Sequence, residues 1–311
     1  MSVLILEDGI HIVADDVRRA CPALSILAAP NAAAGLPFAR DAEVLVALAH
    51  DVTDELVAAM PRLRYVCSLT AGVDHLHGLK ALQPDVRITS GRGIHGPQMS
   101  ELAFLYMISL SRDFSAMQAN QRAHVWQRWP QKLLLGKTAV LVGIGPIAED
   151  MAARCKAFGM TVIGISDARA SAPGFDRLMP RVQLQEAADL ADFLIVLVPL
   201  SERTRHMIDD DVLSAMKRGG IVINLARGPV VDEKALVKRL QDGTLGGAGL
   251  DVFEEEPPAD ESPLWDMKNV IITPRIGGMS DVFAKQILPI VSHNLTCFTE
   301  GRAADMINIV R

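Results

Sequence analysis

The chain has 311 residues, half of them hydrophobic, and its 31 basic and 37 acidic side chains leave a formal net charge of -6. This length accommodates two hydrophobic cores, and a mildly acidic chain without a basic run has no general attraction to nucleic acid or to an anionic membrane. No apolar stretch is long enough to span a bilayer, and the four dispersed cysteines, which form no CxxC pair, predict reduced thiols and a cytoplasmic protein.

The first part of the chain alternates strand-like and helix-like segments. Val3–Leu6, Glu43–Leu48 and Arg64–Leu69 are apolar runs typical of buried strands. Helical patterns at Asp15–Ala20 and Thr53–Met60 separate them. This order predicts parallel strands joined by crossover helices.

A second α/β series follows the almost wholly apolar segment Ser100–Ser111, which predicts a helix buried on all sides, between layers or domains. The strands expected in this series are Thr138–Val142, Thr161–Ile165, Phe193–Val198, Gly220–Asn224 and Val270–Ile272. The helices expected are Met151–Phe158, Lys234–Asp242 and Asp281–Phe298. We expect the last of these to return to the first domain.

A glycine-rich turn carries the strongest functional signal. Residues 140–148 read VLVGIGPIA, which is a strand, a GxGxxA turn and the start of a helix. The first glycine of such a turn permits a tight bend, the second lets the backbone approach a pyrophosphate, and the small third residue allows the helix to pack on the strand. The sequence therefore predicts a dinucleotide site at Gly143, Gly145, Pro146 and Ile147.

The end of the next strand bears on the choice between NAD and NADP. Asp167 favours NAD, because an acidic side chain at this place binds the ribose 2′-hydroxyl. Ser166 and Arg169 suit the 2′-phosphate of NADP instead. The residues leave both cofactors open.

Several later segments resemble the motifs of the D-isomer-specific 2-hydroxyacid dehydrogenases, within which the chain looks most like glyoxylate and hydroxypyruvate reductases. Residues 225–232 (LARGPVVD) resemble the family's arginine motif, and residues 247–257 (GAGLDVFEEEP) resemble its glutamate motif. Residues 198–200 (VPL), with Thr204, are similar to the segment that covers the adenosine, and residues 68–74 (SLTAGVD) are similar to the substrate loop.

The resemblance implies an α/β fold of two Rossmann-like or flavodoxin-like domains with parallel sheets, the cofactor domain being inserted into the substrate domain. Residues 1–99 and 281–311 would form the substrate domain, and residues 100–280 the dinucleotide-binding domain. The resemblance also implies a homodimer, formed at the Ser100–Ser111 helix.

Site residues are likewise implied by the resemblance. Arg227 would hold the carboxylate and carbonyl of a 2-oxo acid, Glu256 would pair with an acid/base histidine, and Asp251 would orient the nicotinamide amide. The substrate loop would offer the backbone N–H groups of Leu69, Thr70, Ala71 and Gly72. Further cofactor contacts would come from Val198, Pro199, Thr204, Leu225, Ala226 and Gly277.

One residue departs from the family pattern. Where the family has Thr-Pro-His-x-Gly-Gly, this chain has Thr-Pro-Arg-Ile-Gly-Gly, so that Arg275 takes the place of the histidine. A guanidinium keeps its proton at pH 7 and is a poor proton shuttle. Either His95 carries the proton, or the substrate or chemistry differs, or the chain binds dinucleotide without turnover; weak residual activity after a neutral change is a fourth possibility.

We therefore expect an NAD(P)-dependent oxidoreductase of small 2-hydroxy or 2-oxo acids with a non-standard acid/base. The alternative is a catalytically impaired dinucleotide-binding protein, a sensor or interaction partner, in the same fold. Asp74, His75 and His77 lack further ligands at matching spacing, so no metal site is predicted. Trp126 and Trp129 either pack at the domain junction or cover a partner subunit's active site.

Overall fold

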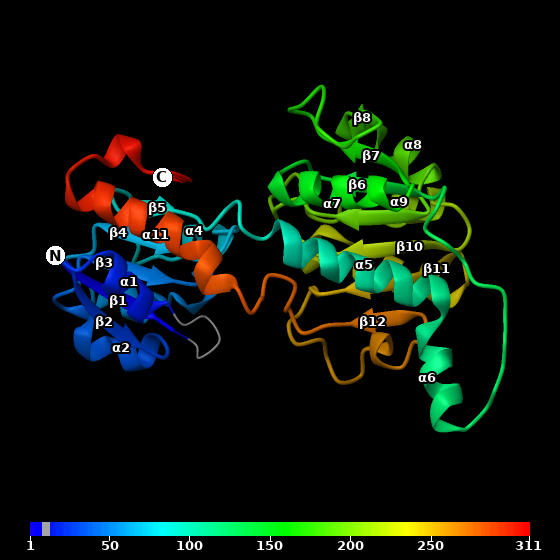
Figure 1. The fold of residues 1–311 in the computed structure, drawn as a ribbon, viewed down its shortest axis with the longest axis horizontal. Coiled ribbons are helices and arrows are strands. Elements are labelled where there is room, and N and C mark those ends of the chain that lie inside the picture. The colour runs from blue at the N-terminus through cyan, green and yellow to red at the C-terminus, as the bar shows by residue number, and fades with distance from the viewer. Residues whose placement is uncertain (8–12) are drawn as a thin grey trace. The chain divides into compact units, whose positions relative to one another are not determined.

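The computed structural model describes residues 1–7 and 13–311. These residues form two compact units. The discontinuous unit comprises Met1–Ile94 and Ser280–Arg311, and the central unit comprises His95–Met279. Both are α/β structures with parallel sheets, as the sequence predicts (Figure 1).

The discontinuous unit is built on a five-stranded sheet in the order β2-β1-β3-β4-β5, in which every neighbouring pair is parallel. Its strands are β1 (Ser2–Leu6), β2 (Ser25–Ala29), β3 (Val44–Ala47), β4 (Tyr65–Ser68) and β5 (Arg87–Thr89). Its helices are α1 (Ala14–Ala20), α2 (Ala32–Ala39), α3 (Asp54–Ala58), α4 (Asp74–His77) and α11 (Phe283–Thr299).

Successive residues of a strand point to opposite faces of a sheet, and both faces of this sheet are buried. Val3 and Ile5 of β1 pack in one core with residues of α1 and α11. Leu4 and Leu6 pack in the other core with residues of α2, α3 and α4. The predicted return of the chain to its first domain is therefore made by α11.

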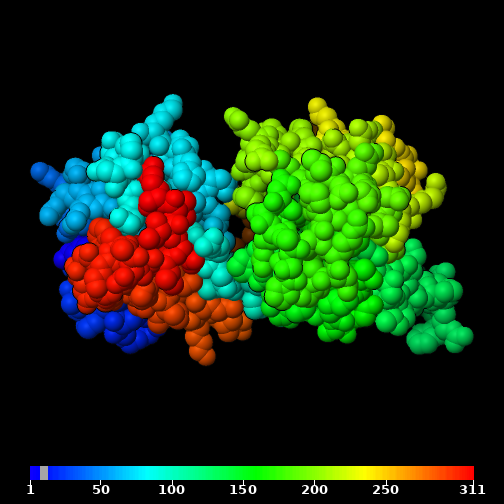
Figure 2. Space-filling view, turned by 90° about the horizontal axis from the view of Figure 1, so that it is seen from above, coloured from blue at the N-terminus to red at the C-terminus, as the bar shows by residue number. Residues whose placement is uncertain are grey.

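The C-terminal segment adds an antiparallel contact to the edge strand β5. Ser90 donates its amide to the carbonyl of Asn308 at 3.0 Å, and Val310 donates to the carbonyl of Ile88 at 2.9 Å. Figure 2 shows this red segment lying against the cyan residues around β5. The edge strand is thus covered, which protects its free N–H and C=O groups from pairing with another chain.

The central unit contains a seven-stranded parallel sheet in the order β12-β11-β10-β9-β6-β7-β8. Its strands are β6 (Thr138–Val142), β7 (Thr161–Ile165), β8 (Arg177–Met179), β9 (Phe193–Val196), β10 (Gly220–Asn224), β11 (Leu245–Leu250) and β12 (Val270–Ile272). Its helices are α5 (Gly96–Arg112), α6 (Phe114–Arg122), α7 (Pro146–Ala157), α8 (Leu184–Asp189), α9 (Asp210–Ala215) and α10 (Glu233–Gln241). The strand order reverses between β6 and β9, which is the position where α/β sheets of this kind bind nucleotides.

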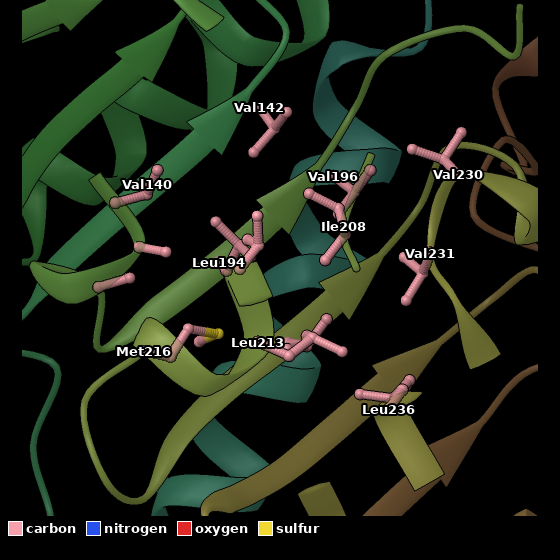
Figure 3. Packing of buried hydrophobic residues seen from close by; sticks show 14 of the residues in the cluster. Val140, Val142, Leu194, Val196, Ile208, Leu213, Met216, Val230, Val231 and Leu236 are labelled. Carbon is pink, nitrogen blue, oxygen red and sulfur yellow. The ribbon is translucent and has the colours of Figure 1, made fainter. Parts of the chain in front are cut away.

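Helices cover both faces of this sheet. Val140, Val142, Leu194 and Val196 point toward α8, α9 and α10, where they meet residues such as Leu213 (Figure 3). The alternate residues of the same strands face α5 and α7. A sheet buried on both faces requires continuous apolar strands, which explains why these strands are visible in the sequence.

The apolar helix α5 differs from its predicted form. It begins at Gly96, four residues before the predicted start, and it is not buried on all sides. Tyr106 and Met107 are fully buried, whereas Leu105 is 53% exposed and Ile108 is 40% exposed. One stripe of the helix therefore packs on the sheet, and another leaves large apolar side chains on the surface of the unit.

Some elements give no clear sequence signal. β11 (LGGAGL) has three glycines, which are depleted in strands, and α2 contains Pro37 within the helix. Tertiary packing decides both elements. No helix in the described ranges combines the length and apolarity needed to cross a bilayer.

Candidate active site

The turn after β6 has the backbone geometry that a diphosphate needs. Gly143 has a φ of 102°, a left-handed value that favours glycine. A Cβ there would lie 2.7 Å from Cγ1 of Val198, so a larger residue would also collide with the segment after β9. A Cβ at Gly145 would meet no heavy atom within 4 Å, which leaves the backbone of that residue open to a ligand.

Helix α7 starts directly at this turn. Gly145 is its N-cap in an extended conformation, Pro146 is its first residue, and Ala148 is buried against the core. The first N–H groups of a helix have no partner within the helix and carry partial positive charge. The residues present therefore fit a pyrophosphate at the N-terminus of α7.

Beyond β7 the ribose-selecting residues already have protein partners. Asp167 accepts a hydrogen bond from the Arg181 amide at 2.8 Å, and its other oxygen lies 3.5 Å from the guanidinium of Arg181 and 3.7 Å from that of Arg203. Ser166 accepts from the Ala168 amide at 3.2 Å. The acidic charge of Asp167 is therefore balanced by two guanidinium groups.

Arg169, the other residue that bears on the cofactor choice, forms an ion pair with Glu149 on α7. That carboxylate offsets the charge with which Arg169 would attract a 2′-phosphate.

Thr204 fixes the conformation of the loop at residues 198–204, which is similar to the family's adenosine-covering segment. The hydroxyl of Thr204 donates to the carbonyl of Pro199 at 2.7 Å and accepts from the amide of Ser201 at 2.8 Å. Thr204 is nearly buried, so it shapes this loop rather than presenting its hydroxyl to solvent. Val198 lies against Gly143 as described above.

The arginine motif follows β10. Leu225 and Ala226 are buried. Asn224, which sequence reasoning missed, accepts from the Ala226 amide at 3.1 Å and donates to the carbonyl of Arg227, also at 3.1 Å. Asn224 therefore fixes the backbone that presents Arg227, whose guanidinium donates to the carbonyl of Ala226 at 2.8 Å.

Gly228 brings the arginine and glutamate motifs together. A Cβ at this position would lie 1.7 Å from the carbonyl oxygen of Phe253 and 2.4 Å from the nitrogen of Glu254. Only a glycine allows the two loops to touch through their backbones. Arg227 and Glu256 are consequently held on adjacent loops of one rigid sheet edge.

Asp251 accepts three hydrogen bonds from the segment that carries Arg275. One carboxylate oxygen accepts from the Thr273 hydroxyl at 2.5 Å and from the Ile276 amide at 2.9 Å, and the other accepts from the Gly277 amide at 2.9 Å. Burial raises the pKa of Asp251, and these three donors, with the charge of Arg275, lower it in part. Asp251 and Gly277, both predicted as cofactor contacts, are thus bonded to each other.

Arg275 stands at the centre of this segment. Its backbone is left-handed with a φ of 55°, and its guanidinium forms an ion pair with Glu256. Glu256 also accepts from the Phe253 amide at 3.2 Å. The structure therefore joins two of the predicted catalytic residues directly.

His95 lies beside the same segment. It is 8% exposed and directly precedes α5. A Cβ at Gly278 would lie 3.3 Å from Cδ2 of the imidazole. His95 therefore lies beside Gly278, which follows Arg275 by three residues in the same motif. The sequence did not show this proximity, because His95 is far from the motif along the chain.

The predicted substrate loop belongs to the discontinuous unit. Leu69 is fully buried and donates its amide to Ala47 at 2.8 Å, and Thr70 donates its amide to the Ser68 hydroxyl at 3.2 Å. These two N–H groups are therefore already used. Of the four amides expected to bind the substrate carboxylate, those of Ala71 and Gly72 therefore remain as candidates.

Comparison with known proteins agrees with this geometry. Residues 104–277 match the family model of the D-isomer-specific 2-hydroxyacid dehydrogenase, NAD binding domain. A glyoxylate reductase from Thermococcus litoralis is 33% identical over 283 residues, which cover 88% of this chain and 85% of that protein.

Two solved structures extend the comparison over the whole chain. A D-isomer-specific 2-hydroxyacid dehydrogenase family protein from Aeromonas salmonicida has a TM-score of 0.90 at 30% identity and covers 100% of this chain and 98% of its own. An NADPH-dependent glyoxylate/hydroxypyruvate reductase from Sinorhizobium meliloti, in complex with NADP and sulfate, has a TM-score of 0.83 at 28% identity with the same coverage. On this evidence the chain belongs to the D-isomer-specific 2-hydroxyacid dehydrogenase family, whose members use NAD or NADP.

Proposed function

We propose that this chain is an NAD(P)-dependent oxidoreductase that interconverts a small 2-oxo acid and the corresponding 2-hydroxy acid. One observation carries the proposal: the contact at Gly228 holds the loops of Arg227 and Glu256 together, in the same unit as the glycine turn at Gly143. The bound nicotinamide would supply or accept the hydride. The protein would hold the cofactor, orient the acid and manage the proton.

Arg227 is the residue that we assign to the substrate carboxylate. A guanidinium offers a planar fork of donors that matches a carboxylate with two hydrogen bonds. Asn224 fixes the backbone on both sides of this residue. The amides of Ala71 and Gly72 are the further carboxylate contacts that we propose.

The Arg275–Glu256 pair replaces the acid/base pair of the family. Arg275 can polarise a carbonyl oxygen or stabilise negative charge that develops on it, but it does not release a proton near pH 7. Glu256 balances its charge. The proton therefore has to come from another group.

We assign that role to His95. Its imidazole packs beside Gly278, in the segment that also contains Arg275, and an imidazole titrates near physiological pH. His95 is the N-cap residue of α5, and its carbonyl accepts from the amide of Met99 at 3.2 Å. This placement supports His95 as the relocated acid/base.

The substrate class follows from the relatives. Relatives of this chain include glyoxylate reductases and a hydroxypyruvate reductase, at 32–34% identity. We propose glyoxylate and hydroxypyruvate as the first substrates to test. Residues 100–280 are the proposed dinucleotide-binding domain, and residues 1–99 with 281–311 the proposed substrate domain.

A homodimer is proposed on the apolar surface of the central unit. Helix α6 and the chain after it extend away from the body of this unit in both views (Figures 1 and 2). Trp126 is 94% exposed. A groove in the same unit is lined by Ile108, Ser111 and Arg112 of α5, by Lys132–Leu135 and by Phe158. A second copy would cover this exposed apolar surface.

We also propose a cytoplasmic location. All four cysteines are buried free thiols. Proteins of oxidising compartments commonly contain disulfides, whereas free thiols are typical of reducing compartments.

The test is a direct assay. Purified protein is mixed with NADH or NADPH and with glyoxylate, hydroxypyruvate, pyruvate or phenylpyruvate, and the absorbance of the reduced cofactor is followed. We expect turnover with at least one of the two smallest acids. Failure of both cofactors to bind in a calorimeter would overturn the proposal.

The Arg275–Glu256 pair also supports a second candidate function, a dinucleotide-binding protein with impaired catalysis. In that case the cofactor binds and no acid is reduced. The Arg275→His variant, assayed beside wild type with cofactor binding measured for both, separates the two functions.

A further inference from the structure

Packing in the central unit explains the aromatic ring of Tyr106 but not its hydroxyl group. Tyr106 lies on α5 with no exposed surface. Its ring rests on Gly249 of β11, where a Cβ would lie 2.3 Å from the ring carbon Cγ. The missing side chain at Gly249 therefore makes room for the ring. An aliphatic residue could fill such a space, so the hydroxyl needs its own explanation.

The hydroxyl of Tyr106 is hydrogen-bonded to the hydroxyl of Thr273, and Thr273 donates to Asp251 at 2.5 Å. An ionised carboxylate only accepts, and each hydroxyl has one proton to donate. The direction of the chain is therefore fixed: Tyr106 donates to Thr273, and Thr273 donates to Asp251. Such a chain strengthens each of its hydrogen bonds by polarisation.

The far end of this chain is the turn that carries Arg275. Asp251 accepts from Thr273 on one side of Arg275 and from the amides of Ile276 and Gly277 on the other. The Arg275 amide itself donates to the carbonyl of Thr273 at 3.0 Å. Both sides of the left-handed residue are thus attached to one buried carboxylate.

We propose that Tyr106 is a positioning residue for the hydride-transfer site, acting through Thr273 and Asp251 to fix the turn that presents Arg275. The effect on the reaction rests on the proposed function of this turn; the effect on the turn itself does not. Loss of the hydroxyl leaves the ring on Gly249 and removes only the donor to Thr273. The turn then becomes looser while the core keeps its packing.

The chain provides a matched control. Tyr65 is also fully buried, and its hydroxyl bonds the hydroxyl of Thr89 at 2.7 Å. Tyr65 belongs to the discontinuous unit and has no role in the proposed site. Tyr65→Phe therefore reports the general effect of removing a buried tyrosine hydroxyl that is bonded to a threonine.

Hydrogen exchange tests the turn without any need for activity. Deuterium uptake is followed by mass spectrometry on peptides that contain Ile276 and Gly277. Tyr106→Phe and Thr273→Val are expected to speed exchange in these peptides severalfold, because a looser turn opens its amides more often. Tyr65→Phe and Thr273→Ser, which retain the chain to Asp251, are expected to leave it unchanged. Equal exchange in Tyr106→Phe and wild type would overturn the proposal.

Kinetics test the consequence for the reaction. Small displacements of a catalytic group lower the rate steeply, so we expect Tyr106→Phe to reduce kcat about tenfold with little change in the KM for the reduced cofactor. In the Thr273→Val background the same change is expected to have no further effect, because its route to Asp251 is already broken. Thr273→Ser, which keeps the hydroxyl that Thr273→Val lacks, should retain most of the wild-type kcat.

The outcomes are distinct. Additive losses in Tyr106→Phe and Thr273→Val, or an equal loss in Tyr65→Phe, would mean that the hydroxyl contributes only to general stability, and the proposal would fail. A wild-type protein that binds cofactor but reduces no acid contradicts the proposed function instead. In that case the exchange experiment still decides whether Tyr106 holds the turn.

Discussion

The guanidinium of Arg275 is ion-paired with the carboxylate of Glu256 on the neighbouring loop. The two side chains are 44% and 29% exposed, and pairs this accessible to solvent contribute at most about 1 kcal/mol to stability. The importance of the pair therefore lies in the charge of the site. Glu256 here compensates a permanent cation, instead of raising the pKa of a group that has to release a proton.

Replacement of Arg275 by histidine should restore an ordinary acid/base. A general acid or base contributes about a hundredfold or more to the rate. Arg275→His should therefore raise kcat for 2-oxo acid reduction by about this factor where the wild type lacks an acid/base, and by less where His95 already supplies the proton. Steady-state assays across pH are the measurement, and the rate of the variant should fall as pH rises through the imidazole pKa. Arg275→Lys, which keeps a cation, is the control. If Arg275→His is active, wild type is inert and both bind the cofactor, the second candidate function is favoured. If wild type is active and Arg275→His is no faster, the expected gain is contradicted.

Removal of the His95 imidazole should abolish proton transfer. His95→Gln is expected to lower kcat about a hundredfold or more, while calorimetry should show unchanged affinity for the reduced cofactor. His77→Gln is the matched control because His77 is an exposed residue of the other unit. Turnover that survives His95→Gln at the wild-type rate would remove His95 from the mechanism.

Substitution of the first glycine of the turn tests the cofactor site. Gly143→Ala adds a Cβ 2.7 Å from Val198 at a φ of 102°, so the turn has to move, and cofactor affinity should fall at least about tenfold, or 1.4 kcal/mol. Gly243→Ala is matched in strain, with a φ of 74°, but its Cβ would meet nothing within 4 Å. The control should lower the melting temperature slightly and leave binding intact. Equal affinities in the two variants would show that the turn does not hold the diphosphate.

The charge at Asp167 should tune the choice between cofactors. Asp167→Asn removes the anion that Arg181 and Arg203 now balance, so two uncompensated guanidinium groups would favour a 2′-phosphate. We expect the ratio of NADPH to NADH affinity to rise about tenfold. The rise should be smaller in high salt, because the side chains of Arg181 and Arg203 are 30% and 74% exposed. Asp189→Asn, which removes an exposed carboxylate on α8, is the control. An unchanged ratio would place the ribose elsewhere.

Asp192 should make the central unit sensitive to acid. Burial raises the pKa of Asp192, but hydrogen bonds from Lys217 and the Thr138 amide, with the charges of Lys217 and Lys137, lower it below the ordinary value of 3.8. A depressed folded-state pKa contributes stability that is present above the unfolded pKa and is lost as pH falls through the folded pKa. Asp192→Asn should therefore cost about 1–2 kcal/mol in urea unfolding at pH 7, and the cost should shrink below about pH 4. A loss that is independent of pH would contradict this origin.

The sequence by itself determined the fold class, most of the strands and the cofactor turn. The apolar runs at Thr138–Val142 and Phe193–Val198 predict strands buried on both faces, and the structure forms them at Thr138–Val142 and Phe193–Val196. The first glycine of the turn, Gly143, is required by the local backbone conformation. Both signals are local, because they depend on the residue and its immediate neighbours. Arg227, Glu256 and the missing histidine were likewise visible, as members of contiguous motifs.

Only the tertiary structure decided which of these residues work together. The contact of Gly228 with Phe253, the bonds from Asp251 to the Arg275 turn, and the place of His95 beside Gly278 all join residues far apart in the sequence. Tyr106 gave no sequence signal, because its partners lie on β11 and after β12. Local propensity cannot report contacts that arise from sheet order and packing, since these are set by the folding of the whole unit.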